Sequence, residues 1–195
     1  MPAVKYATPT CPTDCTTADL PAIAMADCVD AMITEESEIQ EIFMTINDGA
    51  GAPKAKPTSW TSKSDWLAVI ADTGNDKVRK LNVIGDKPLA DATTRTLSKR
   101  RKKAGTKTQT INFDIDDISP ANYDFMRQLQ CGATVVIWYS TVGGYLYGGP
   151  NGFEVSVANI GEVLDRGENN YAVIRGILSW ENQFSPPRIA NPMAA

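Results

Sequence analysis

Apolar and polar residues alternate along much of the chain after residue 38, and this two-residue period is typical of half-buried strands. The clearest run is Gly152–Val157, in which Phe153, Val155 and Val157 share one face. The pattern therefore predicts a mainly β domain. Other strand-like segments are Ile39–Ile46, Lys80–Ile84, Thr110–Ile115, Thr134–Tyr139, Tyr145–Tyr147 and Tyr171–Trp180.

One segment between these strands follows the helical period instead. Tyr123, Met126 and Leu129 recur at helical spacing, and Ser119 and Pro120 supply an N-cap and a proline in the first turn. Such an apolar stripe is far more often core than a cofactor site. Strands, one packed helix and further strands together predict a β-sandwich or β-barrel closed on one side by the helix.

A second segment, Ser64–Asp72, fits two structures. It reads either as a short helix capped by Ser62 or Ser64, or as a strand. The sequence alone leaves both open.

The ends of the chain differ from its middle. Residues 1–35 contain Pro2, Pro9, Pro12 and Pro21 and are expected to form an extended N-terminal arm, with a short helical turn near Ala22–Val29. Residues 36–182 form the β-rich domain, and residues 183–195 are expected to be an extended tail.

The segment Thr93–Ile115 predicts a hairpin with unusual chemistry. Threonine recurs at strand-like spacing, but large apolar side chains are nearly absent from Thr93 to Thr110. A hairpin with so little core is marginal alone, so we expect it to be ordered by another subunit or by a polyanion. An unbroken basic run joins its two strands: Lys99, Arg100, Arg101, Lys102 and Lys103.

Three interpretations of the basic run remain open. It is a solvated loop, as charge runs often are. It is a subunit contact that becomes ordered on assembly. Or it binds nucleic acid, which would show as binding that falls steeply with salt.

Composition limits the wider choices. The chain has 195 residues with 43% hydrophobic residues, which is ordinary for one globular domain. A net charge of -4 argues against wholesale nucleic-acid binding and makes the basic run a local feature. No apolar run approaches the roughly 20 residues of a membrane helix, and the first ten residues lack the apolar core of a secretory signal. We therefore expect synthesis inside a cell and no membrane partner.

The chain has four cysteines and no histidine. Only Cys11 and Cys15 form a close pair, which argues against a structural zinc site. A Cys11–Cys15 or Cys11–Cys28 disulfide is compatible with an oxidising medium, whereas free thiols, Cys131 included, are expected in a reducing cytoplasm.

The candidate chemistry is limited to carboxylates. Without histidine, the commonest general base is missing. Asp114, Asp116 and Asp117 form an acidic cluster, and Asp114 and Asp116 would share one strand face suited to a cation or an acid pair. They also fit the solvent side of a strand whose other face carries Phe113 and Ile115. No phosphate loop or nucleophile motif is present, so we expect no cofactor and no enzyme, with a carboxylate-based hydrolase ranked last.

The layout from Ile39 to Trp180 resembles the tail tube family of long-tailed bacteriophages and its relatives in head-to-tail connecting rings. The resemblance rests on the weakly apolar hairpin Thr93–Thr110, the helix Ser119–Gln130 and the closing strand that ends in Leu-Ser-Trp-Glu181. The segment Ile137–Gly152 is also similar to structural proteins of phages that infect Bacteroidetes.

The resemblance implies hexameric rings stacked into a tube in the virion tail, assembled in the host cytoplasm. In this family the hairpin reaches a neighbour and the sheet lines a channel through which DNA passes without specific binding. Such lumens are typically negative, so the basic run is placed at a subunit contact facing Asp114–Asp117 or Glu162–Asp165 of a neighbour. The expected partners are other copies and adjoining virion proteins; a capsid decoration or connector protein is the alternative.

Overall fold

A computed structural model describes residues 37–49, 52–74, 77–96, 102–132, 134–164 and 172–194, with the backbone alone for 91–96 and 102–104. These residues form nine strands and two helices. The elements are β1 (Ile39–Ile46), α1 (Lys63–Ala71), β2 (Arg79–Asp86), β3 (Asp91–Thr96), β4 (Lys102–Ile115), α2 (Pro120–Leu129), β5 (Thr134–Thr141), β6 (Tyr145–Tyr147), β7 (Phe153–Val163), β8 (Val173–Glu181) and β9 (Arg188–Ala190).

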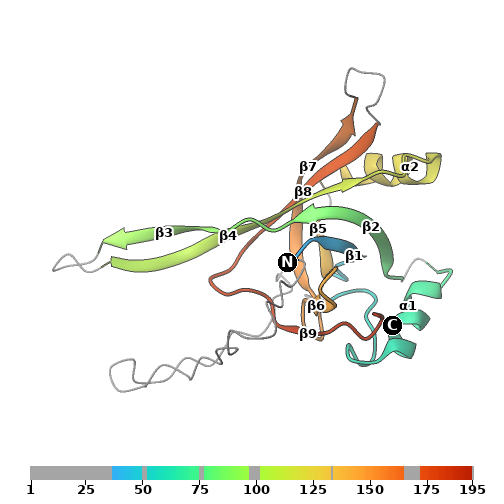
Figure 1. The fold of residues 1–195 in the computed structure, drawn as a ribbon, viewed down its shortest axis with the longest axis horizontal. Coiled ribbons are helices and arrows are strands. Elements are labelled where there is room, and N and C mark those ends of the chain that lie inside the picture. The colour runs from blue at the N-terminus through green and yellow to red at the C-terminus, as the bar shows by residue number, and fades with distance from the viewer. Residues whose placement is uncertain are drawn as a thin grey trace, which may run out of the picture.

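Six of the strands close into an antiparallel barrel (Figure 1). The order around the barrel is β1, β2, β4, β8, β7 and β5, and β5 returns to pair with β1. That last ladder runs from Ile39 opposite Thr141 to Ile46 opposite Val135. The sequence left a sandwich and a barrel open, and this ladder makes the fold a barrel.

The remaining three strands extend the barrel wall. β3 pairs with the first half of β4, whereas β2 pairs with the second half of the same edge. β6 pairs with the end of β5, and β9 pairs with β6. The segment 183–195, expected to be an extended tail, therefore contributes a short edge strand.

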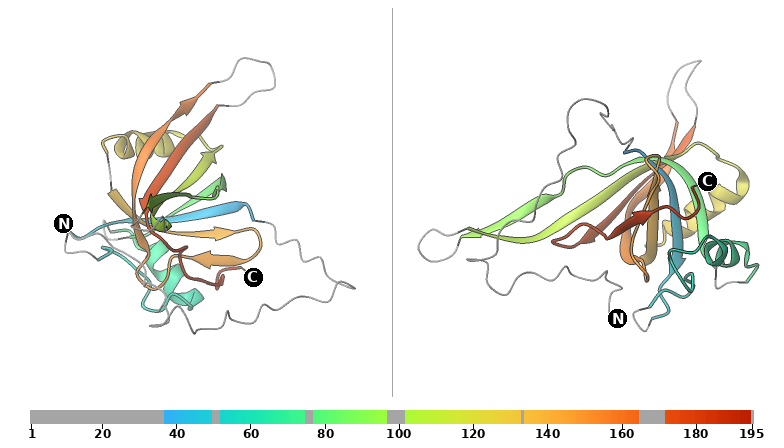
Figure 2. Two further views of the ribbon diagram at one scale, coloured as in Figure 1. Left: turned by 90° about the vertical axis from the view of Figure 1, so that its left-hand side faces the viewer. Right: turned by 60° about the horizontal axis from the view of Figure 1, so that its bottom comes forward.

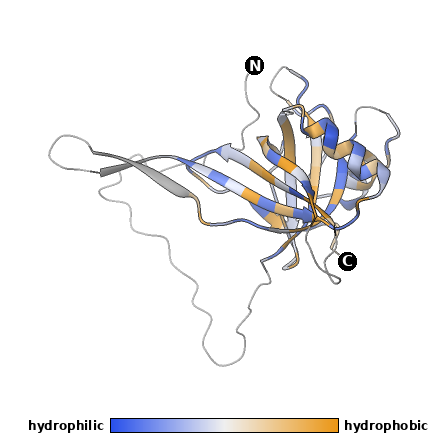
Figure 3. Ribbon diagram, turned by 90° about the horizontal axis from the view of Figure 1, so that it is seen from above, coloured by the Kyte–Doolittle hydropathy of each residue, from blue (hydrophilic) through white to orange (hydrophobic). Residues whose placement is uncertain are grey.

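The barrel interior is filled by alternate side chains of its strands. Figure 3 colours the ribbon orange at hydrophobic residues, which recur along these strands. On β4 these are Ile111, Phe113 and Ile115, all buried. α2 closes one end of the barrel with Met126 and Leu129, which confirms the predicted packed helix. Its N-terminus differs in detail from the prediction, because the Ser119 side chain makes no capping hydrogen bond.

A second apolar cluster lies outside the barrel, between α1 and the strands β1 and β5. The Trp66 ring of α1 lies 5.1 Å from the Phe43 ring and 5.4 Å from the Trp138 ring, centroid to centroid. β5 is therefore buried on both faces from Val135 to Thr141, which explains its continuous apolar sequence. Of the two structures that the sequence left open for Ser64–Asp72, the described residues adopt the helix, and Ser62 caps it by accepting a hydrogen bond from the Asp65 amide. Neither helix of the described residues is long and apolar enough to cross a membrane.

Candidate assembly site

The β3–β4 hairpin projects well beyond the barrel, as Figures 1 and 2 show. β4 has 14 residues, but it pairs with β8 only from Thr108 onward. Before Thr108 its only strand partner is β3, which in turn pairs with no other described strand. The outer edge of β3 thus has no strand beside it in the described part of the chain.

The root of this hairpin is fixed to the barrel by Gln109. Its side chain is 2% exposed, and its amide nitrogen donates to the carbonyls of Asn182 (3.2 Å) and Phe184 (2.6 Å). The Asn182 amide donates in turn to the Lys107 carbonyl at 2.9 Å. The connection that follows β8 therefore holds β4 where it leaves the barrel. The sequence did not reveal this role, because Gln109 lies in a run of threonines that reads as solvent-facing.

The structure describes only part of the predicted basic run. Lys99, Arg100 and Arg101 lie outside the described residues. Lys102 and Lys103 begin β4, where their backbones pair with Thr96 and Arg95 of β3. The two described residues of the basic run therefore lie at the far end of the projecting hairpin.

The predicted acidic cluster has internal partners. Asp114 accepts two hydrogen bonds from Arg175 of β8, at 2.8 Å from Nε and 2.7 Å from Nη2. These hydrogen bonds hold the pKa of Asp114 below its ordinary value, against a smaller opposing effect of burial. Asp117 accepts from the Ser119 amide at 2.9 Å and so orders the entry to α2.

This geometry corrects one detail of the prediction. β4 ends at Ile115, so Asp116 lies beyond the strand and does not extend the face of Asp114. Phe113 and Ile115 are buried as expected. Among the described residues, no three carboxylate, cysteine or histidine side chains are grouped to hold a metal ion.

The basic and acidic candidates lie at opposite ends of β4. About a dozen strand residues separate Lys102 from Asp114, which corresponds to about 40 Å at about 3.3 Å per residue. The two groups cannot meet within one copy of the chain. Any pairing between them requires a second copy.

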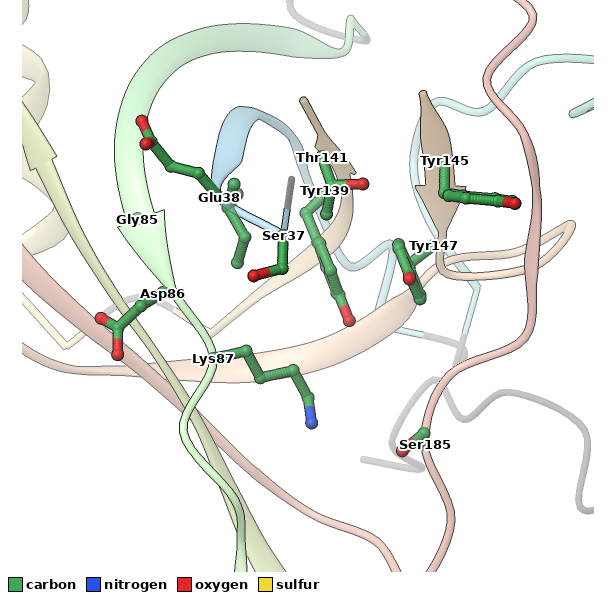
Figure 4. A pocket seen from close by; sticks show the side chains of 11 residues that line it. Ser37, Glu38, Gly85, Asp86, Lys87, Tyr139, Thr141, Tyr145, Tyr147 and Ser185 are labelled. Atoms are coloured by element: carbon green, nitrogen blue, oxygen red, sulfur yellow. The ribbon is translucent and has the colours of Figure 1, made fainter. Parts of the chain in front are cut away.

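A cavity of about 590 Å³ with a mixed polar and apolar lining opens at the barrel end opposite α2 (Figure 4). We call it the mouth cavity; it is formed by the ends of β1, β2, β5 and β6. The Tyr139 and Tyr147 rings on its wall are stacked, with centroids 4.7 Å apart. No local sequence pattern indicated this cavity, because its walls come from residues far apart in the chain.

Lys87 brings a positive charge into the mouth cavity. Its ammonium lies 5.9 Å from the centroid of the Trp180 ring, and partial burial, followed by the charge of Lys107, lowers its pKa. The neighbouring Asp86 carboxylate accepts from Asn112 at 3.1 Å, and Figure 4 shows it directed away from the Lys87 ammonium. Glu38 and Asp86 also line the cavity, so its wall carries charges of both signs.

Only one of the four cysteines, Cys131, lies among the described residues. Cys11, Cys15 and Cys28, and with them both proposed disulfides, lie outside the described residues. Cys131 follows α2, is exposed and is a free thiol.

No protein-family model matches the chain, and no curated protein matches its sequence at a significant level. The described residues define a closed antiparallel barrel with a plugging helix, a covering helix and a projecting two-stranded hairpin.

Proposed function

We propose that the protein is a structural subunit of a bacteriophage virion that assembles ring-wise into a tail tube or tail ring and forms a conduit for DNA. The observation that carries the proposal is the projecting β3–β4 hairpin, whose outer strand has no further strand beside it among the described residues. It agrees with the resemblance in layout to tail tube proteins. The wall of the conduit would be built from barrel strands, and the hairpin would link neighbouring copies.

The hairpin needs a partner for a physical reason. An isolated two-stranded hairpin is marginal in water, and this one has few large apolar side chains with which to make a core. Exposed strand edges pair readily with strands of another chain. Adding a strand would satisfy the backbone groups on the outer edge of β3.

The charge distribution favours another copy as that partner. The whole chain is acidic at -4, yet its basic run lies on the hairpin. Asp116 and Glu162 are exposed carboxylates near the other end of the barrel. A hairpin tip that contacts this end of a neighbour would pair unlike charges that one copy keeps about 40 Å apart.

Negative-stain electron microscopy of the purified full-length chain tests the proposal directly. We expect six-fold rings or tubes at low salt and high protein concentration. Monomers or trimers that never form rings under any condition would instead support the alternative, a capsid decoration or connector protein.

Neutralising the basic run tests the role of the hairpin. A variant with Gln at all five positions, Lys99, Arg100, Arg101, Lys102 and Lys103, should need at least a tenfold higher protein concentration to assemble. Sedimentation measures this concentration. A control with Lys56→Gln and Lys63→Gln, both exposed and remote, should assemble normally. Gel shifts with duplex DNA distinguish the other interpretation: steeply salt-dependent binding that the neutral variant loses would place DNA, and not a subunit, on the hairpin.

A further inference from the structure

The closed end of the barrel carries an uncovered apolar groove. α2 is fixed toward β7, where the Gln130 side chain donates to the Ile160 carbonyl at 3.0 Å. On the opposite side, α2 leaves a space of about 370 Å³ beside the end of β1 and the start of β2. We call this space the α2 groove.

The walls of the α2 groove are apolar and its rim is basic. Phe125, Leu129 and Val135 line it, and Ile46 at its edge is 49% exposed. Lys77 and Arg79 form the rim, and neither has an ion-pair partner among the described residues. The groove therefore suits an apolar segment that carries negative charge.

The N-terminal arm has this composition. The run Leu20–Ala26 is apolar, with Asp19 before it and Asp27 and Asp30 after it. Within residues 1–36 the only basic residue is Lys5. The carboxylates of residues 1–36 are Asp14, Asp19, Asp27, Asp30, Glu35 and Glu36.

The direction of β1 favours a second copy over the same one. The described chain begins at Ser37 beside the mouth cavity, whereas the α2 groove lies at the other end of β1, about 26 Å away for eight residues. An arm that leaves the mouth end meets the groove end of a copy stacked head to tail. Such a contact between unlike surfaces repeats from copy to copy, as a tube requires.

We propose that the segment Leu20–Asp30 of one copy docks in the α2 groove of the next. Its apolar side chains would cover Ile46 and Phe125, and its aspartates would pair with Lys77 and Arg79. The inference rests on the proposed self-assembly and names the contact that links successive copies.

Two native cysteines make the contact testable. Cys28 lies within the docking segment, and the exposed thiol of Cys131 lies two residues beyond Leu129 of the groove. One full-length variant keeps Cys28 alone and a second keeps Cys131 alone, with the other cysteines changed to Ser. Mixed, co-assembled and treated with a short bifunctional maleimide, they should give a cross-linked heterodimer.

A matched control replaces the first variant with one that keeps Cys11 alone, because Cys11 lies outside the docking segment. Its heterodimer yield should be several-fold lower. When the Cys131 variant also carries Lys77→Glu and Arg79→Glu, its cross-link to Cys28 should be lost. Adding Asp27→Lys and Asp30→Lys to the Cys28 variant should restore the cross-link.

The outcomes separate this inference from the proposed function. Tubes or rings that form without a preferential Cys28–Cys131 cross-link would overturn the docking proposal and leave the tube proposal standing. In a chain that keeps both cysteines, a purely internal cross-link would show docking within one copy and also overturn it. Absence of any assembly by microscopy would count against the proposed function itself.

Discussion

Gly176 and Phe113 occupy facing positions in the ladder between β8 and β4. The Phe113 ring lies across the glycine, and a Cβ placed on Gly176 would come within 2.3 Å of the ring's Cζ atom. Phe113 is buried in the barrel core, so its ring has little room to move. Position 176 therefore has to be glycine, because any larger residue would collide with the Phe113 ring.

We expect Gly176→Ala to lower the free energy of unfolding by about 1–3 kcal/mol, the usual cost of overpacking a core. Urea denaturation measures it. Gly161→Ala is the matched control, because a Cβ there meets no atom within 4 Å on a neighbouring barrel strand. Equal stability of the two variants would show that the Phe113 ring moves aside at little cost.

The Asp114–Arg175 pair gives a pH dependence of known sign. The pKa of Asp114 is lower in the folded chain than in the unfolded chain, so the pair stabilises the fold above the unfolded pKa of about 3.9. That contribution is lost as the pH falls through the folded pKa. Because both side chains are partly exposed, its size should be below about 1 kcal/mol.

Asp114→Asn should therefore be slightly less stable than the native chain at pH 7 and equally stable near pH 2, with the difference closing below about pH 4. Chemical denaturation at a series of pH values measures this difference. A difference that stayed constant down to pH 2 would assign it to packing and not to charge.

At the scale of elements, the hairpin depends on its root. Gln109→Leu would keep a buried side chain of similar size but make it apolar, and would leave the Asn182 and Phe184 carbonyls without this donor. We expect a loss of about 1–3 kcal/mol and faster amide hydrogen exchange in residues 102–107. Thr108→Val, at the exposed neighbouring position, should change exchange there much less. Unchanged exchange in Gln109→Leu would mean that backbone pairing alone holds the root.

Elements with a strong local pattern were predictable from the sequence. β1, β5 and β7 follow the expected apolar positions, and α2 follows its helical stripe and its Pro120 start. α1 stayed ambiguous because its place is set by Trp66, which packs against two strands that lie elsewhere in the sequence.

The candidate sites were predictable only in part. The hairpin follows from its threonines and basic run, since composition alone shows that it has little core. The mouth cavity, the α2 groove and the Gln109 anchor arise where distant segments meet. Local sequence patterns do not indicate contacts between segments that are far apart in the chain.

At the scale of the whole molecule, the two ends of the barrel differ. The mouth cavity, the projecting hairpin and the start of the described chain lie at one end, and α2 and its groove lie at the other. A molecule with unlike ends that recognise each other builds open, directional assemblies, and a symmetric pairing of like ends would stop at a dimer. The proposed tube and the proposed arm contact both depend on this polarity.

The ladder between β1 and β5 has a consequence for the time at which this protein can fold. Gln40 of β1 hydrogen-bonds to Thr141 of β5 across 101 positions of sequence. β1 is synthesised early, yet the strand that completes the barrel beside it emerges only after α2. Pairing of distant strands costs chain entropy before the stabilising contacts form, so closure should be slow and late. Until then, the exposed edge of β1 can pair with the wrong strands. Closure of the barrel covers this edge in the folded protein. A newly made chain must therefore close its barrel before it meets other copies.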